Sequence, residues 1–343
     1  MTMPLLELPK FSAIVTCYNY ERYVAKAIES VASQVYSNFE CIIVDDASTD
    51  GSVDVIRETI ARLEDKRFRL ISLDKNIDQT EAGLRGLDEA AGDFVAFLDA
   101  DDWWTPDFVS LHIAAHLNEL VNVGVSCCDM IMIDAEDRQL ARTIMSFQKG
   151  RKFDGLKPKE KLLKSQLRHE ELGGLQRPEP SFYYFEHGIT ANWRFAPMSA
   201  MVFRRALLNN LRPPPDWLGG KRIKNVDYIY AMIASTLTGW IAIDTACCTY
   251  RLHTANMMSS NPLGGGLYWM SGFWSFRDTQ RMYNHNEATI VKNYQALKSS
   301  YGHWFVMLTM LRLGSVAPLR CFACVAWMTI KYLVSEKRIS RQD

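Results

Sequence analysis

Short apolar runs alternate with amphipathic segments through the first third of the chain. Four short, mainly apolar runs predict strands: Phe11–Thr16, Cys41–Val44, Phe68–Leu73 and Phe94–Leu98. Apolar residues at three- and four-residue spacing predict helices between and after them: Val24–Val35, Val55–Leu63, Ala82–Ala91 and a fourth that continues through Leu120. Strands that alternate with helices in this way predict a parallel sheet with right-handed crossovers.

Two of the predicted helix ends carry residues that are typical of helix caps. Thr105 and Pro106 have the residue types of an N-cap and a first helical position, so a helix is expected to begin there. Gly92 is expected at the position just beyond the preceding helix, where a glycine accommodates the left-handed backbone.

Two of the predicted strands end in acidic residues. Asp45 and Asp46 follow one strand, and Asp99, Asp101 and Asp102 follow another. In open α/β sheets the carboxyl ends of the strands are where ligands bind. Clustered carboxylates repel one another, and their oxygens suit Mg²⁺, Mn²⁺ or Ca²⁺ better than zinc. The pattern therefore predicts a cation site, and the alternative is a solvated acidic turn that caps the next helix.

Composition and motifs narrow the function. Lys+Arg and Asp+Glu number 39 each among 343 residues, so the overall charge indicates no nucleic-acid partner. The glycine patterns of dinucleotide-binding and P-loop sites are absent. Neither a signal peptide within Met1–Lys10 nor an uncharged run of membrane-spanning length is present, and most cysteines lie in apolar runs, so we expect a reduced, cytoplasmic protein.

The first half resembles the family 2 glycosyltransferases. The motifs that carry the resemblance are Ile14–Asn19, Val44–Asp50, the loop at Asn76 and Phe97–Asp102. Further matches lie in the second half: Met198–Arg205, Asn225–Tyr228 and Cys248–His253. The resemblance implies an α/β protein with the GT-A type of Rossmann-like mixed sheet flanked by helices, to which this chain adds a C-terminal helical extension.

The resemblance also implies roles for residues of the first half. It assigns nucleotide binding to seven residues: Thr16, Tyr18, Asn19, Asp45, Asp46, Asp99 and Ala100. Within this set Asp46 would accept a hydrogen bond from the base, and Asp45 would shape the adjacent turn. Asp101, helped by Asp99, would hold Mn²⁺ or Mg²⁺ against the diphosphate. Candidate contacts to the diphosphate or the acceptor are Asp102, Trp103, Arg251 and His253.

Three stretches depart from the family pattern. Members often carry glycine two residues after the asparagine of the Asn76 loop, where this chain has Asp78. An Ala-Arg-Asn-x-Gly run is replaced by Ala82–Gly86, so a nucleotide contact by Arg85 is not expected. The Glu-Asp pair that members carry in the second half is Val226-Asp227 here.

Asp227 is the residue to which the resemblance assigns the chemistry. It would act as the general base that deprotonates the acceptor hydroxyl, since a sugar hydroxyl is a poor nucleophile. Asp227 also opens a helical pattern, so the alternative is an acid that only stabilises the first helical turn. For His253 the alternative is a histidine whose hydrogen bonds are satisfied at the end of a strand.

The chain divides by pattern into three parts. Residues 1–122 form the nucleotide-sugar half, residues 123–260 the acceptor half with a loop-rich insertion at about 137–195, and residues 261–343 a helical extension. The insertion is interpreted as an acceptor-binding region or as solvated loops. Arg312, Arg320 and Lys331 interrupt the apolar runs of the extension, which is expected either to lie on a membrane surface or to pack on the catalytic domain.

The resemblance thus predicts a metal-dependent, inverting, hexosyltransferase-type glycosyltransferase. It would transfer a sugar from a nucleotide-diphosphate sugar to a glycan or lipid-linked acceptor in cell-surface polysaccharide or glycolipid assembly, at the inner face of the membrane. The alternatives are a polyprenyl-phosphate glycosyltransferase and a non-catalytic nucleotide-sugar-binding scaffold. A sugar-phosphate nucleotidyltransferase is disfavoured, because Thr16–Tyr20 is not glycine-rich.

Overall fold

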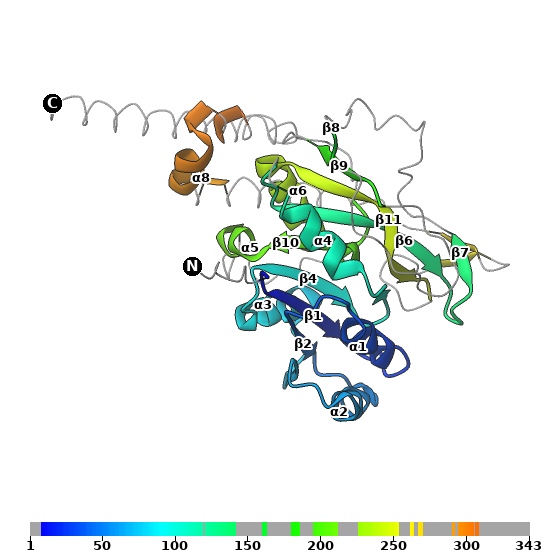
Figure 1. Ribbon diagram of the computed structural model, residues 1–343. Coiled ribbons are helices and arrows are strands. Elements are labelled where there is room, and N and C mark those ends of the chain that lie inside the picture. Colours follow the sequence, from blue (N-terminus) through cyan, green and yellow to red (C-terminus); the bar gives the residue numbers. More distant parts are fainter. Residues whose placement is uncertain are drawn as a thin grey trace, which may run out of the picture.

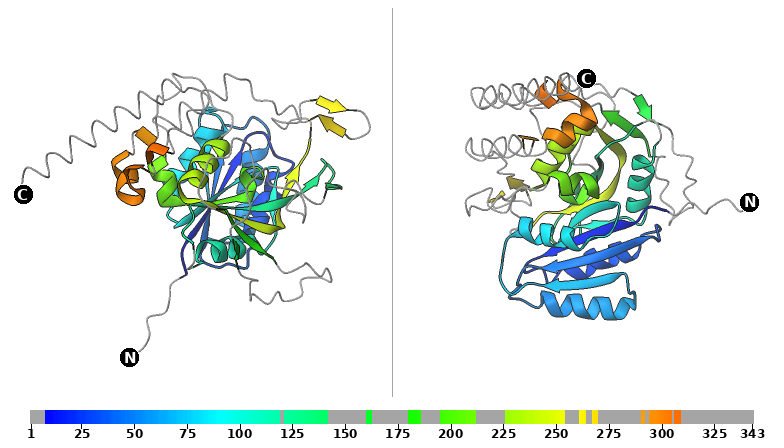
Figure 2. Two further views of the ribbon diagram at one scale, coloured as in Figure 1. Left: turned by 90° about the horizontal axis from the view of Figure 1, so that it is seen from above. Right: turned by 90° about the vertical axis from the view of Figure 1, so that its left-hand side faces the viewer.

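The structure is a computed structural model, shown in Figure 1. It describes residues 8–118, 121–141, 160–162, 180–185, 195–211, 226–253, 261–263, 267–269, 290–291, 294–304 and 306–308. Over these residues the chain forms one large mixed sheet with helices on both faces, as the sequence predicted (Figures 1 and 2).

The first half supplies four parallel strands in the order β3-β2-β1-β4. They are β1 (Phe11–Cys17), β2 (Phe39–Asp45), β3 (Phe68–Ser72) and β4 (Phe94–Asp99). All four predicted strands are confirmed, and β1, β2 and β4 are almost completely buried. Thr16 of β1 lies opposite Val44 of β2 and opposite Asp99 of β4, so the acidic ends of β2 and β4 flank the end of β1.

The predicted helices are also present. They are α1 (Val24–Ala32), α2 (Ser52–Leu63), α3 (Gln79–Glu89) and α4 (Phe108–His116). The helix α3 packs on β1 and β2, and it lies on the face of the sheet opposite to α4 (Figure 2). Their buried apolar faces and the strands form one continuous core.

The second half continues the same sheet through strand pairs of mixed direction. Its main strands are β10 (Met201–Arg204), β6 (Val125–Ile133) and β11 (Trp240–Arg251). β10 is antiparallel to both β4 and β6, whereas β11 runs parallel to β6. The short strand β5 (Trp103–Trp104) pairs with β11 directly after the acidic turn. This pairing brings the end of β11 next to the end of β4.

Other elements complete the described part of the chain. They are β7 (Gln139–Ala141), β8 (Glu160–Leu162), β9 (Phe182–Phe185), η1 (Met198–Ala200), α5 (Arg205–Leu211), α6 (Val226–Thr238), β12 (Asn261–Leu263), β13 (Leu267–Trp269) and α8 (Tyr294–Tyr301). β8 and β9 extend the far edge of the sheet, so part of the predicted insertion is β-structure. Most of the insertion, and residues 309–343 with the charges predicted to interrupt the extension, lie outside the described residues.

Three local predictions are wrong. α4 begins at Phe108, with Asp107 at the N-cap position, because Thr105 forms a turn in which its hydroxyl donates to the Asp107 carboxylate. The same helix ends at His116 and not at Leu120. α1 ends at Ala32, which leaves Val35 outside the helix and 62% exposed.

Gly92 is required for a different reason from the predicted one. α3 is followed by an extended Ala90, and Gly92 is not among the glycines with positive φ. Its amide donates to the Ser12 hydroxyl at 2.8 Å, and a Cβ atom at Gly92 would lie 2.7 Å from the backbone nitrogen of Ser12. The glycine thus permits a close backbone approach between two segments.

Two further sequence predictions can be compared with the structure. The six cysteines within the described residues are buried free thiols, as expected: Cys17, Cys41, Cys127, Cys128, Cys247 and Cys248. None of the helices in the described ranges is long and apolar enough to cross a membrane.

Candidate active site

The site begins where β1, β2 and β4 end. The amide of Ala100 donates to the Thr16 carbonyl at 3.1 Å, and the amide of Asp46 donates to the Cys17 carbonyl at 2.8 Å. These backbone bonds continue the sheet by one residue at each strand end. They hold the two predicted acidic segments on either side of β1.

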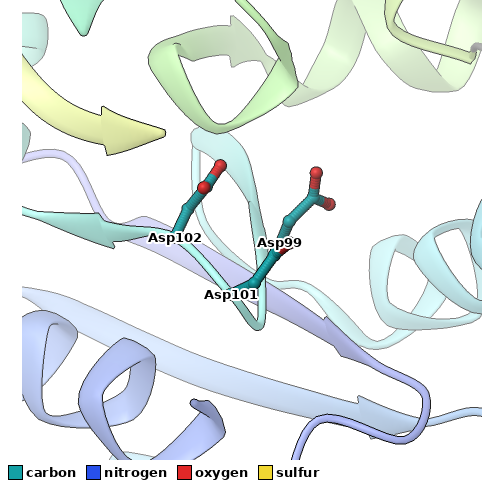
Figure 3. A group of neighbouring side chains, drawn as sticks. All are labelled: Asp99, Asp101 and Asp102. Carbon is teal, nitrogen blue, oxygen red and sulfur yellow. The ribbon is translucent and has the colours of Figure 1, made fainter. Parts of the chain in front are cut away.

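Asp99, Asp101 and Asp102 lie together on the turn that follows β4 (Figure 3). One carboxylate oxygen from each lies within 4.8 Å of the others. The amide of Asp102 donates to the Asp99 carbonyl at 3.0 Å, which closes the turn. The side chains of Asp99 and Asp102 point to the same side of the turn in Figure 3. The sequence predicted that three acids follow this strand, and the structure shows that they lie close together.

Asp102 is the most deeply buried member, with 1% of its surface exposed. Its Oδ1 atom accepts a hydrogen bond from the Arg251 amide at 3.0 Å, whereas its buried Oδ2 atom has no hydrogen-bond partner among the residues that the structure describes. Burial, followed by the charges of Asp101 and Asp99, raises the pKa of Asp102 well above its usual value. A buried acceptor without a partner, beside two other carboxylates, is a place that favours a cation.

Asp101 is tied to the other half of the sheet. Its Oδ2 atom lies 2.9 Å from Nε2 of His253, just after the end of β11, and both side chains are buried. The His253 ring contacts the rings of Tyr20 and Tyr23 at centroid distances of 5.7 and 5.4 Å. Burial and the nearby charges of Asp101 and Asp99 raise the pKa of Tyr20, so this phenol stays protonated.

The donor set fits a hard divalent cation. Carboxylate oxygens are the ligands that Mg²⁺ and Mn²⁺ prefer, and Mg²⁺ is usually held by one or two carboxylates together with substrate phosphates. Asp99 is partly exposed and accepts a hydrogen bond from the Gln79 side chain, so the cluster opens toward solvent on that side. The residues present therefore suit Mg²⁺ or Mn²⁺.

Asp45 and Asp46 organise the loops around the expected nucleotide position. Oδ2 of Asp45 accepts from the Ser48 amide at 3.0 Å, which closes the turn after β2, and a role of Asp45 in nucleotide binding stays a prediction. The two carboxylate oxygens of Asp46 accept from the amides of Ile77 and Asp78 at 2.7 and 3.0 Å. Asp46 thus fixes the loop before α3, and its contact with a base stays a prediction.

Asn19 joins the loops that follow β1 and β2. It has a positive φ of 59°, its Oδ1 atom accepts from the Thr49 amide at 2.7 Å, and its own amide donates to Ser48 Oγ at 2.9 Å. Tyr18 beside it is 44% exposed, and Thr16 is buried. The bonding by Asn19 and Ser48 was not anticipated, although the polar turn after β2 was visible in the sequence.

Arg251 is buried, and its guanidinium is engaged by the protein. Nε donates to the Asp101 carbonyl at 3.1 Å, and Nη1 donates to the carbonyls of Asp134 and Ala135 at 3.1 and 3.2 Å. The guanidinium also lies over the ring of Trp103, 5.1 Å from its centroid. Arg251 is thus bonded to the backbone of the acidic turn and packs on Trp103. A contact of either residue with a diphosphate stays a prediction.

Ser199 is a buried residue of the site that the sequence reasoning missed. Its hydroxyl accepts from the Asp99 amide at 3.2 Å, and its carbonyl accepts from Nε1 of Trp104 at 2.7 Å. The available signal was a serine within the apolar run Met198–Phe203. Through these bonds η1 holds both ends of the acidic turn.

Asp227 lies in the first turn of α6, as the helical pattern predicted. Its side chain lies outside the described part of the structure. Its assignment as the general base therefore stays a prediction.

Similarity to known proteins agrees with this arrangement. The model of the family described as "Glycosyl transferase family 2" matches residues 12–211 of the chain. Over 97 residues the chain is 45% identical to the uncharacterized glycosyltransferase alr2836 of Nostoc sp., which covers 28% of this chain and 30% of that protein. Over 104 residues it is 38% identical to WfaP of Escherichia coli, the UDP-Glc:alpha-D-GlcNAc-diphosphoundecaprenol beta-1,3-glucosyltransferase, which covers 30% of this chain and 39% of WfaP. These matches span well under half of either relative.

Solved structures share the fold. TarS 1–349 of S. aureus in complex with UDP-GlcNAc has a TM-score of 0.51 at 16% identity, over 94% of this chain and 88% of that one. The same protein in complex with UDP has a TM-score of 0.50 at 16% identity, over 94% and 87% of the two chains. At this identity the likeness concerns the fold, and it confirms the expected mixed α/β sheet of GT-A type.

Proposed function

The chain belongs to glycosyl transferase family 2, and on this premise we propose that it transfers a sugar from a nucleotide-diphosphate donor to an acceptor hydroxyl. The observation that carries the proposal is the cluster of Asp99, Asp101 and Asp102 at the carboxyl end of β4. Ligands of open α/β sheets bind at such strand ends, and diphosphates are bound there through a cation held by carboxylates.

Asp101 and Asp99 would hold Mn²⁺ or Mg²⁺ in this proposal. A bound divalent cation neutralises the negative charge that develops on the departing diphosphate, which is worth several kcal/mol in such reactions. The burial of Asp101 and its contact with His253 keep its carboxylate in place for this task. Asp102, whose Oδ2 atom is buried, is a further candidate for a ligand of the cation or for a contact with the diphosphate.

The nucleotide would lie over the ends of β1, β2 and β4. Thr16 lies near the end of β1, and Tyr18, Asn19 and Ala100 lie on the segments that follow β1 and β4. Asp45 and Asp46 shape the neighbouring loops. The exposed ring of Tyr18 is available to pack on a base. Trp103, Arg251 and His253 remain candidates for the diphosphate or acceptor side.

Asp227 would act as the general base. A carboxylate in reach of the acceptor hydroxyl removes its proton as the new bond forms, and such catalysis contributes typically 10²- to 10⁴-fold. One in-line attack by this hydroxyl on the anomeric carbon breaks the bond to the diphosphate and inverts the configuration. Support for this role comes from the family resemblance around Asn225–Tyr228, in which Asp227 is the retained acid.

The acceptor is proposed to be a glycan or a lipid-linked glycan in polysaccharide assembly. Support comes from the name of WfaP, which acts on a diphosphoundecaprenol-linked sugar. A lipid-linked acceptor would bring the protein to the surface of the membrane. Direct transfer of the sugar to a polyprenyl phosphate is the second candidate, and it too is suggested by the lipid-linked acceptor in the name of WfaP.

Calorimetric titration of UDP, GDP, dTDP and CDP, each with and without Mn²⁺, tests the proposal. We expect one nucleotide to bind tightly only with Mn²⁺, and Asp101→Ala to lose that dependence. Asp88→Ala, at an exposed position of α3, serves as the control variant. Equal affinity of wild type and Asp101→Ala with Mn²⁺ would overturn the metal assignment. Binding of no nucleotide would refute the proposed donor site.

A further inference from the structure

Asp137 lies in the tight turn between β6 and β7, outside every motif discussed so far. The turn is rigid, because Oδ1 of Asp134 accepts from the amides of Glu136 and Arg138 at 3.0 and 2.8 Å. Asp137 itself has a φ of 65°, a left-handed conformation that Asp and Asn tolerate better than most residues. Its carboxylate is therefore presented in a defined direction.

This carboxylate bridges cations from two different elements. Oδ1 of Asp137 lies 2.6 Å from Nη2 of Arg251, at the end of β11. Oδ2 lies 2.7 Å from Nζ of Lys26, on α1. Partial burial acts to raise the pKa of Asp137, but the hydrogen bonds to Lys26 and Arg251 hold this pKa below its usual value. The turn thus joins α1 of the first half to β11 of the second.

Both cations pack against the residue that follows the carboxylate cluster. Nζ of Lys26 lies 3.5 Å from the centroid of the Trp103 ring, and the Arg251 guanidinium lies 5.1 Å from it. Cations at these distances from an indole ring are attracted by its negative face. Trp103 therefore contacts two cations that both pair with Asp137.

Arg251 continues the connection to the cluster itself. Its side-chain Nε atom donates to the Asp101 carbonyl, and its amide donates to the Asp102 carboxylate. The Arg251 side chain is 3% exposed, so this cation depends on protein groups in place of water. A displacement of the guanidinium would therefore be passed to the backbone between Asp101 and Asp102.

We propose that Asp137 is a positioning residue for the carboxylate cluster, acting through Arg251 and Trp103 on the orientation of Asp101 and Asp102. The inference rests on the proposed function, since it concerns how well the cluster holds a divalent cation and the nucleotide diphosphate. Groups that orient metal ligands from behind typically contribute 10- to 100-fold to metal affinity.

Two substitutions test this role. Asp137→Asn removes the charge with an isosteric side chain that also tolerates a positive φ, and Asp137→Gly removes the carboxylate where the backbone favours glycine. We expect both to weaken Mn²⁺ binding, measured by calorimetry with MnCl₂ alone, by about 10-fold or more. Nucleotide affinity without Mn²⁺ should stay unchanged, whereas affinity with Mn²⁺ should fall. A variant that is only less stable would still be folded well below its melting temperature. Its nucleotide affinity would then match that of the wild type both with and without Mn²⁺.

Glu136→Gln is the matched control, because Glu136 lies in the same turn but forms only exposed pairs, to Arg22 at 4.0 Å and to Arg138 at 3.4 Å. It should bind Mn²⁺ and nucleotide as wild type does. Wild-type Mn²⁺ affinity in either folded Asp137 variant would overturn the inference. Failure of the wild type to bind Mn²⁺ and every nucleotide would instead refute the proposed function, so the two failures are distinguishable.

Discussion

Nε2 of His253 lies 2.9 Å from Oδ2 of Asp101, although 152 positions separate the two residues in the sequence. The contact forms because β5, directly after the acidic turn, pairs with β11, whose end leads into His253. It links the carboxylate that is proposed to hold a cation to the other half of the sheet. The contact therefore makes His253 a test of how that carboxylate is held.

His253→Ala should weaken Mn²⁺-dependent nucleotide binding by roughly 10- to 100-fold, because Asp101 loses this contact and the orientation that it imposes. Calorimetric titration of the nucleotide preferred by the wild type measures the effect. His253→Gln can still donate a hydrogen bond and should lose less affinity than the alanine variant. Equal Mn²⁺-dependent affinity in the alanine variant and the wild type would show that this contact does not orient Asp101.

Asp227→Asn should bind the donor nucleotide as wild type does but transfer the sugar about 10²- to 10⁴-fold more slowly, because an amide cannot remove the proton of the acceptor hydroxyl. Binding by calorimetry and release of the nucleoside diphosphate with acceptor present give the two quantities. Asp244→Asn on β11 is a control for an unrelated acid. Turnover near the wild-type rate would remove Asp227 from the mechanism.

A buried pair of histidines predicts acid sensitivity. Ser126 Oγ lies 2.7 Å from Nδ1 of His112 and 3.0 Å from Nε2 of His116. Nε2 of His116 also lies 3.1 Å from the Val202 carbonyl, which can only accept, so this nitrogen carries the proton. Burial lowers the pKa of His112 well below 6.5 and that of His116 to about 3.

The sign of the pH effect follows from these shifts. Below pH 6.5 the unfolded chain takes up protons at both histidines that the folded chain does not, so the stabilisation present above that pH is lost as the pH falls toward 3. Between pH 7.5 and 5.5 the pair should contribute a loss of roughly 3 kcal/mol in the free energy of unfolding, measured by urea denaturation.

Two variants distinguish the contribution of His112 and His116 to the pH dependence from that of other titrating groups. His112→Asn with His116→Gln places similar hydrogen-bonding atoms without a titrating ring, so it should show a smaller loss over the same pH range. Ser126→Ala keeps both histidines and should retain the full loss. The same pH dependence in the double variant and the wild type would contradict the assignment.

The backbone conformation of Asp78 predicts that its substitution by glycine does not destabilise the protein. Its backbone has φ 84° and ψ 148°, a region that is essentially confined to glycine and costs about 1 to 3 kcal/mol for other residues. Glycine, the residue that the family resemblance implies at this position, adopts such a conformation without that cost. The Asp78 side chain compensates in part, because it accepts a hydrogen bond from the Thr80 amide at the start of α3.

Asp78→Gly should therefore be about as stable as the wild type or more so, by up to roughly 1 kcal/mol, since it relieves the backbone strain and a glycine cap costs only a few tenths. Asp78→Ala keeps the strain and loses the cap, so it should be less stable by about 1 kcal/mol. Urea denaturation of the three proteins measures both values. A glycine variant less stable than the alanine variant would refute the account.

The alternation of elements and the acidic strand ends could be predicted because they are local. An apolar run that meets a pair of acids, as at Val44 and Asp45, shows where a buried strand changes to a polar segment within a few residues. The helix ends were less predictable, since Thr105 and Asp107 are both N-cap residues and only their contact selects one. The structural need for a glycine at position 92 was likewise not predictable, because it arises from a contact with Ser12, which lies 80 positions earlier.

The sequence by itself determined the parallel half of the sheet and the presence of three carboxylates at the end of β4, because strand periodicity and charge are properties of neighbouring residues. Only the tertiary structure decided what surrounds these carboxylates. Ser199 contacts this acidic segment from η1, Arg251 and His253 contact it from the end of β11 and just after it, and Asp137 contacts Arg251 from the turn after β6. Their positions follow from the pairing of distant strands, and no local pattern of residues encodes which distant strands will pair.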